Sequence, residues 1–164
     1  MSEKLQAVLK ASVEEVLERM FFIQSLEELD DLGDEPQIAA QVTFEGTPSG
    51  WLALSMATAA ARSVAADFLG SGEGQLSEAQ TGEVICELAN MICGSVLSRV
   101  ESTSTFHLRK PGLLPRPWSS SRWPGDPGET AFAVTYAAEM GNGRIRVIFN
   151  PAEPAWSTAE KSAF

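Results

Sequence analysis

The sequence has few of the residues that build metal sites and disulfide scaffolds. Its 164 residues include two cysteines and one histidine, His107. Two cysteines cannot form a disulfide-rich scaffold, and one histidine cannot supply a multi-histidine metal site. Nucleophile schemes that pair a serine or a cysteine with a histidine would all rest on His107 alone. We therefore expect no metal site in this chain.

Positive charge is also scarce. Twelve Lys and Arg stand against twenty-two Asp and Glu, for a formal net charge of −10. Phosphate-bearing surfaces attract basic faces, so this balance argues against nucleic acid and anionic membranes as partners. No apolar run reaches the roughly 18 residues that span a bilayer, and residues 51–69 are interrupted by Arg62 and Asp67. The N-terminus alternates charged and apolar residues, unlike a secretory signal, so we expect a cytoplasmic protein.

The composition is that of a folded domain. Hydrophobic residues make up 44% and charged residues 21% of the chain, which is close to the norm for globular proteins. A chain of this length buries enough surface for one core. We expect a single domain over residues 1–150, followed by a loosely held tail over 151–164.

Apolar periodicity and turn residues predict the order of elements. Three segments have helical spacing, and several short segments alternate as strands do. Gly141-Asn142-Gly143 is a strong hairpin signal. The expected class is α+β, with a mostly antiparallel sheet packed against long helices. The expected helices are 3–20, 57–69 and 77–100. Within the first of them, Ser12 and Glu15 match a capping box, which would delay the start of the helix or interrupt it. The expected strands are 21–26, 37–45, 51–56, 106–110, 130–138 and 144–149.

Residues 112–128 form a long expected loop that is rich in proline and glycine. It contains Trp118 and Trp123. Aromatic residues are enriched at protein interfaces, so the loop could form an interaction patch. It could equally cover an exposed face of the same chain, and the sequence leaves both alternatives open.

The helix over residues 81–100 has one narrow polar strip. Its apolar residues cover about two-thirds of the circumference at 100° per residue. Glu87 and Asn90 are three residues apart and therefore neighbours on the helix surface. The strip also contains a glycine, Gly94. A glycine inside a helix lowers its stability by about 0.5–1 kcal/mol relative to alanine, and close approach of a ligand or another backbone would offset that cost. The residues of the strip are Glu83, Glu87, Asn90, Gly94 and Ser98.

The segment Glu87-Leu-Ala-Asn90-Met-Ile-Cys-Gly94 resembles the E-x-x-N-M-I-x-G signature of the CheX branch of the CheC/CheX/FliY chemotaxis phosphatase family. The order of helices and strands over roughly residues 3–150 is also similar to that family. The resemblance implies an enzyme that removes the phosphoryl group from the aspartyl phosphate of a response-regulator receiver domain. It implies that Glu87 pairs with the receiver's lysine and that Asn90 orients the attacking water. Glu83, Gly94 and Ser98 would contact the partner, and Mg²⁺ would be held by the receiver.

This sequence departs from the family pattern at several positions. The first helix carries Glu14, Glu15 and Glu18 but no second E-x-x-N, so one site is expected. Glu83 stands where CheC-type motifs have Asp or Ser, and Ser95 stands where CheX relatives often have Asn. A non-catalytic module that binds a receiver or another signalling protein is therefore the alternative, and a third is an unrelated α/β domain whose E-x-x-N is a coincidence.

Two further expectations concern pairing. The resemblance implies a homodimer, because CheX relatives pair through their sheets and the hairpin over 130–149 presents strand edges. Cys86 and Cys93 are seven residues apart, about 10 Å along a helix axis. Because a disulfide needs Cα atoms closer than about 7 Å, we expect both cysteines to pack as small apolar residues.

Overall fold

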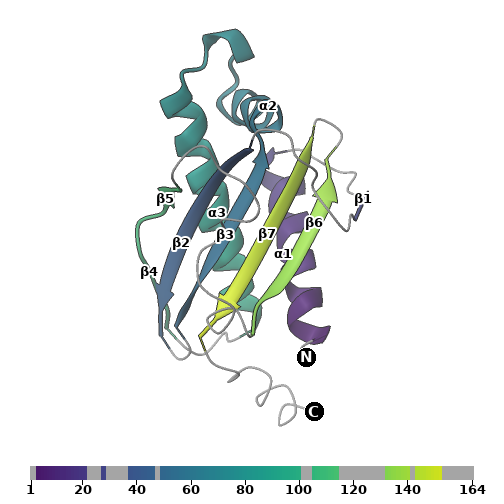
Figure 1. Ribbon diagram of the computed structural model, residues 1–164, viewed down its shortest axis with the longest axis vertical. Helices are drawn as coiled ribbons and strands as arrows, with labels where there is room; N and C mark the ends of the chain where they lie inside the picture. The colour runs from purple at the N-terminus through teal and green to yellow at the C-terminus, as the bar shows by residue number, and fades with distance from the viewer. Residues whose placement is uncertain are drawn as a thin grey trace.

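The computed structural model describes residues 3–21, 27–28, 37–46, 49–100, 105–114, 132–140 and 143–152. Within these residues the chain forms two layers, with the helices gathered on one face of a sheet (Figure 1). The helices are α1 (Glu3–Phe21), α2 (Thr58–Leu69), the short 3-10 helix η1 (Glu73–Gln75) and α3 (Glu78–Val100). The strands are β1 (Glu27–Glu28), β2 (Gln37–Glu45), β3 (Gly50–Ala57), β4 (His107–Leu108), β5 (Gly112–Leu113), β6 (Val134–Glu139) and β7 (Arg144–Pro151).

The described strands form one antiparallel sheet. Their order is β1-β6-β7-β3-β2-β4, and β5 also pairs with β2. The strands β2 and β3 pair as neighbours in sequence, and so do β6 and β7, as the hairpin signals predict. The α+β class with an antiparallel sheet is therefore confirmed.

The register of the sheet aligns its apolar side chains in rows under the helices. One row runs across four strands through Val42, Leu52, Phe149 and Val134. All four side chains belong to the buried core. Phe44 of β2 stacks on Phe149 of β7 with ring centroids 5.3 Å apart. Burial of each large apolar side chain contributes about 1.5–3 kcal/mol, so these rows fix which face of the sheet receives the helices.

Local signals set the ends of α2 and α3 as expected. Gly70 follows α2 in the left-handed conformation, with φ of 69°, and its N–H bonds to the carbonyl of Ala66. At the start of α3, the N–H of Gln80 donates to Ser77 Oγ at 3.0 Å. The N–H of Ser77 donates in return to Gln80 Oε1 at 2.9 Å. This capping box fixes where the helix that carries the polar strip begins.

The first helix differs from its prediction. It runs without a break from Glu3 to Phe21, so the capping-box match at Ser12 does not start or interrupt it. Ser12 is fully buried, and its hydroxyl has no hydrogen-bond partner among the residues that the structure describes. Phe21, expected to begin a strand, ends the helix instead and stacks on Phe68 of α2 at 4.8 Å. Packing between the helices therefore overrides the local signals, and residues 22–26 lie outside the described residues.

Two short edge strands, β1 and β5, also differ from the prediction. β1 lies outside the expected strands, and it pairs with the end of β6 at Ala138 and Glu139. β5 lies within the segment 112–128, which the sequence predicted as a loop. It forms a strand there because its backbone pairs with β2. The next residue, Leu114, donates its N–H to the carbonyl of Ala39 at 2.9 Å. Residues 115–128 of that loop, with both tryptophans, lie outside the described part of the chain.

The boundaries of the last hairpin also shift. β6 begins at Val134, later than expected, and β7 continues to Pro151, which is buried. The extension occurs because β7 pairs with β3 from Ile145, opposite Met56, to Pro151, opposite Gly50. β7 is therefore an inner strand, with β6 on one side and β3 on the other.

Candidate functional site

The helix α3 presents Glu87 and Asn90 on its outer side. Its buried side packs against α1, α2 and β2 through residues that include Leu88, Ala89 and Ile92. Glu87 is exposed and Asn90 is half-buried. Residues three apart on a helix have Cβ atoms about 5–6 Å apart. The carboxylate and the carboxamide are therefore adjacent and can be reached from solvent.

The rest of the polar strip is open as well. Glu83 and Ser98 are exposed, and Gly94 is half-buried. A Cβ placed on Gly94 would meet no atom of the described residues within 4 Å. No packing in this part of the protein thus requires the glycine, although it lowers helix stability. The five residues that the sequence singled out lie together along one side of α3.

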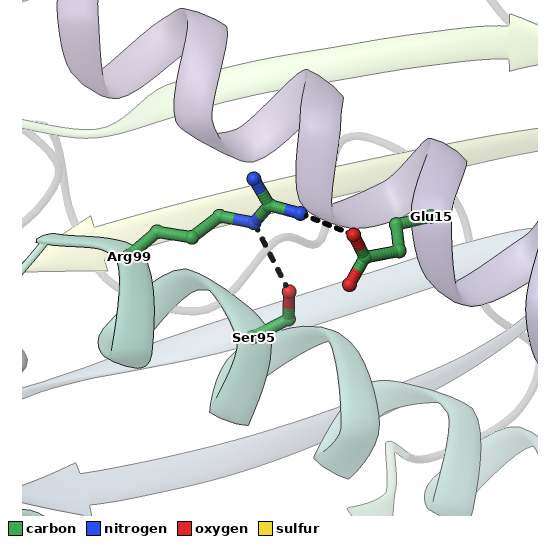
Figure 2. Close-up of polar contacts among 3 residues, drawn as sticks. All are labelled: Glu15, Ser95 and Arg99. Atoms are coloured by element: carbon green, nitrogen blue, oxygen red, sulfur yellow. Dashed lines mark hydrogen bonds and ion pairs between the residues drawn. The ribbon is translucent and has the colours of Figure 1, made fainter.

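On one flank of the strip, α1 joins α3 through a polar contact that Figure 2 shows. Arg99 donates from Nη2 to Glu15 Oε2 of α1 at 2.7 Å and from Nε to Ser95 Oγ at 3.4 Å. The Arg99 and Glu15 side chains are 34% and 39% exposed, so water weakens their attraction. Ser95, which departs from the family pattern, thus helps to orient Arg99.

On the other flank, β5 lies against the beginning of α3. A Cβ on Gly82 would come within 2.7 Å of Leu113 Cδ1, so the leucine side chain lies directly over the glycine. Gly82 is buried, whereas 47% of Leu113 is exposed. The polar strip is therefore bounded by α1 on one side and by a short apolar edge strand on the other. Sequence patterning did not single out Leu113, although its place after Pro111 in an apolar run was a weak signal.

The two cysteines of α3 remain thiols, as their positions on the helix predict. Both are free, with Cys86 half-buried and Cys93 buried. Burial and the nearby charge of Glu83 raise the pKa of Cys86. Burial raises the pKa of Cys93 to about 12. Because a raised pKa suppresses the thiolate, neither cysteine is suited to act as a nucleophile.

Among the residues that the structure describes, the other titratable groups form no metal centre. No group of three or more metal-ligating side chains occurs among the described residues. His107 is exposed on β4, opposite Glu45 of β2. Arg109 pairs with the same Glu45 at 2.8 Å and lowers the pKa of its carboxyl group. In the described part of the chain, the candidate site on α3 therefore consists of two neighbouring side chains. The carboxylate of Glu87 can accept hydrogen bonds, and the amide of Asn90 can both donate and accept them.

Comparison with known families places this site in context. The family described as Chemotaxis phosphatase CheX matches residues 38–115. That range holds β2 from its second residue, together with β3, α2 and α3 and the whole polar strip. No curated protein sequence matches the chain. None of the described helices is long and apolar enough to cross a membrane.

Solved structures share the fold over nearly the whole chain. The chemotaxis protein CheX from Vibrio vulnificus is 16% identical, with a TM-score of 0.70 over 92% of this chain and 97% of that chain. The CheX–CheY–BeF3–Mg²⁺ complex from Borrelia burgdorferi gives 16% identity and a TM-score of 0.70 over 90% and 97% of the two chains. FliY from Thermotoga maritima gives 14% identity and a TM-score of 0.58 over 92% and 88%. These likenesses show that the chain has the fold of the CheX and FliY proteins.

Proposed function

Because this chain is a CheX-like member of the CheC/CheX/FliY family, we propose that it is a phosphatase for the aspartyl phosphate of a response-regulator receiver domain. The observation that carries the proposal is the exposure of Glu87 beside the half-buried Asn90 on α3. A pair buried against the chain's own sheet could not meet a phosphorylated partner. The proposal also accounts for the open space over Gly94, which would admit the backbone of a partner.

The chemistry requires little from this chain beyond positioning. Hydrolysis of an acyl phosphate needs a water in line with the leaving oxygen and stabilisation of the charge on the phosphoryl oxygens. The Asn90 amide can accept a hydrogen bond from water through Oδ1 and donate one through Nδ2, so it can fix the direction of the water. The carboxylate of Glu87 can pair with a receiver lysine and hold the two proteins in register.

Magnesium belongs to the partner in this scheme. The neighbouring complex from Borrelia burgdorferi contains CheX, CheY, BeF3 and Mg²⁺. The strip on α3 offers Glu83 and Glu87 as its carboxylates, too few to hold a cation in a cage of oxygen ligands. We therefore assign the cation to the receiver, where it would neutralise the phosphoryl oxygens while Asn90 directs the water.

The test is phosphate release from phosphorylated receiver domains, with a panel of receivers encoded in the same genome. We expect the wild-type protein to accelerate release from at least one receiver. Asn90→Ala should lower kcat by about a hundredfold or more, because it removes the group that orients the nucleophile. Glu87→Gln should mainly raise KM, by about tenfold, because it weakens pairing with the receiver lysine.

Glu18→Gln is the matched control, since Glu18 is an exposed carboxylate on α1 outside the strip. It should leave kcat and KM within about twofold of the wild-type values. If the wild-type protein accelerates release from no receiver in the panel, the enzymatic proposal is wrong.

The alternative is a binding module without catalysis. It is favoured by the contact of Ser95 with Arg99, since this serine departs from the family pattern next to Gly94. Binding of a receiver with no faster dephosphorylation would select this alternative.

We also propose that the protein forms a homodimer through a sheet edge. The hairpin β6–β7 offers only the outer edge of β6, because β7 is an inner strand. Within the described residues, β1 pairs with this edge at Ala138 and Glu139 only. Light scattering that gives the monomer mass at high concentration would contradict the homodimer.

A further inference from the structure

We propose that Leu113 is a docking residue for the receiver domain and sets its affinity without taking part in the chemistry. This inference rests on the proposed function, because it assumes that a receiver occupies the strip around Glu87 and Asn90. It adds a contact outside α3, on the edge strand β5, that the E-x-x-N motif does not contain.

Exposure alone does not distinguish Leu113. Among the described residues, the exposed large apolar side chains are Leu113 at 47%, Met20 at 44% and Leu69 at 44%. Single exposed apolar residues are common on soluble proteins. What singles out Leu113 is its location, because its side chain lies over Gly82 of the helix that carries the site.

The contact with Gly82 places Leu113 at one end of a surface ridge. Residues four apart on a helix lie one above the other, so Gly82, Cys86, Asn90 and Gly94 form one such ridge. The side chain of Leu113 covers the first position, within 2.7 Å of where a Cβ on Gly82 would lie. The next position along the ridge is Cys86, which is half-buried, and the position after that is Asn90.

The distance along the ridge fits within one protein interface. Gly82 and Asn90 are eight residues apart, which is about 12 Å along the helix axis. An interface of ordinary size buries about 800 Å² on each partner, equivalent to a disc of about 16 Å radius. A receiver centred on Asn90 therefore reaches Leu113.

The two glycines of the ridge show which space is already filled. Over Gly82 the space is taken by the chain's own leucine, and over Gly94 it is empty in the described residues. The surface that a partner meets is thus apolar at Leu113, polar at Asn90 and recessed at Gly94. A receiver would fit this surface if an apolar side chain beside its active-site lysine met Leu113 while the lysine itself met Glu87.

Backbone pairing holds Leu113 in place before any partner arrives. It pairs in register with Ala40 of β2, and the following N–H, that of Leu114, bonds to the carbonyl of Ala39 at 2.9 Å. A side chain on a fixed backbone loses less conformational entropy on binding than one on a free segment. The leucine can therefore contribute a favourable apolar contact at little entropic cost.

The test compares Leu113→Ser with Leu69→Ser. Leu69 ends α2, next to Phe68, which packs on α1, and its exposure nearly equals that of Leu113. Binding is measured to receiver domains loaded with BeF3⁻ and Mg²⁺, and turnover is measured with the same receivers phosphorylated. Leu113→Ser should raise Kd and KM about five- to tenfold and leave kcat unchanged, because it removes an apolar contact and none of the groups proposed to act in the chemistry. Leu69→Ser should stay within twofold of wild type.

A conservative variant separates docking from folding. Leu113→Met keeps the apolar volume and should keep Kd within about twofold of the wild-type value. If Leu113→Ser binds as tightly as the wild type while Asn90→Ala still abolishes turnover, Leu113 is not a docking residue and the proposed function stands. If Leu69→Ser weakens binding as much as Leu113→Ser does, the proposed location is wrong. If the wild type binds none of the receivers, the proposed function fails and this inference fails with it.

Discussion

The guanidinium of Arg99 lies 2.7 Å from the carboxylate of Glu15, and this contact ties the end of α3 to α1. Both side chains are about one-third exposed, so water screens their attraction. The pair stands beside the strip that carries Glu87 and Asn90. It aligns two helices whose association depends mainly on buried apolar residues, such as Leu17 on α1 and Val96 on α3.

We predict a small coupling energy between these two residues. In a double-mutant cycle with Glu15→Gln and Arg99→Gln, urea unfolding should give a coupling of about 0.2–1 kcal/mol. The coupling should shrink in high salt, since the pair is partly exposed. A coupling above about 2 kcal/mol that persists in high salt would show that the contact is shielded from water.

The open space over Gly94 predicts that Gly94→Ala raises stability. Alanine has the higher helix propensity, and the added methyl group meets no described atom within 4 Å. The free energy of unfolding should rise by about 0.5–1 kcal/mol. Under the proposed function, the same variant should bind the receiver less tightly, because the methyl group fills space that the partner uses.

Gly143→Ala serves as the matched control for that substitution. Gly143 has φ of 151°, and a Cβ there would overlap the Cβ of Ala60. Its replacement should lower the free energy of unfolding by about 1–3 kcal/mol. Urea unfolding of the two variants should therefore shift in opposite directions, and a Gly94→Ala protein less stable than the wild type would contradict the open space.

The pKa of Cys93 predicts a loss of stability at alkaline pH. Burial raises this pKa from 9.0 to about 12 in the folded state. Above pH 9 the unfolded chain therefore releases the thiol proton while the folded chain keeps it. Stability contributed by the protonated thiol is present below pH 9 and is lost as pH rises toward 12, by at most about 1.4 kcal/mol per pH unit.

Urea unfolding of the wild type and of Cys93→Ala between pH 8 and 10.5 measures this effect. The variant is expected to be less stable at pH 8, because it leaves a small cavity, but to lose less stability with rising pH. Cys86 has a pKa raised in the same direction and contributes equally to both proteins. Parallel pH dependences would contradict the assignment to Cys93.

Patterns within a few residues predicted the parts of the fold that local chemistry decides. Ser77 and Gln80 cap α3, and Gly70 ends α2, because both signals act through the nearest backbone groups. The spacing of Glu87 and Asn90 likewise fixed their adjacency, since a helix has a constant rise and turn. The roles of these two residues remain predictions.

Features that depend on distant segments were not predictable in the same way. Phe21 belongs to α1 because Phe68, far away in sequence, stacks on it. β5 forms because β2 offers an edge to Gly112 and Leu113, whose own sequence has no strand pattern. The position of the Leu113 side chain over Gly82 follows from that pairing, so local sequence motifs do not predict it.

The inner position of β7 also has a consequence for the order of synthesis and folding. The strand that joins β3 to β6 is the last of the described strands to leave the ribosome. Until β7 has emerged, β3 and β6 each lack the strand that pairs with them on that side in the finished sheet. A protein that stops short of residue 144 cannot close this gap and should accumulate as insoluble material, even though its whole polar strip has already been translated.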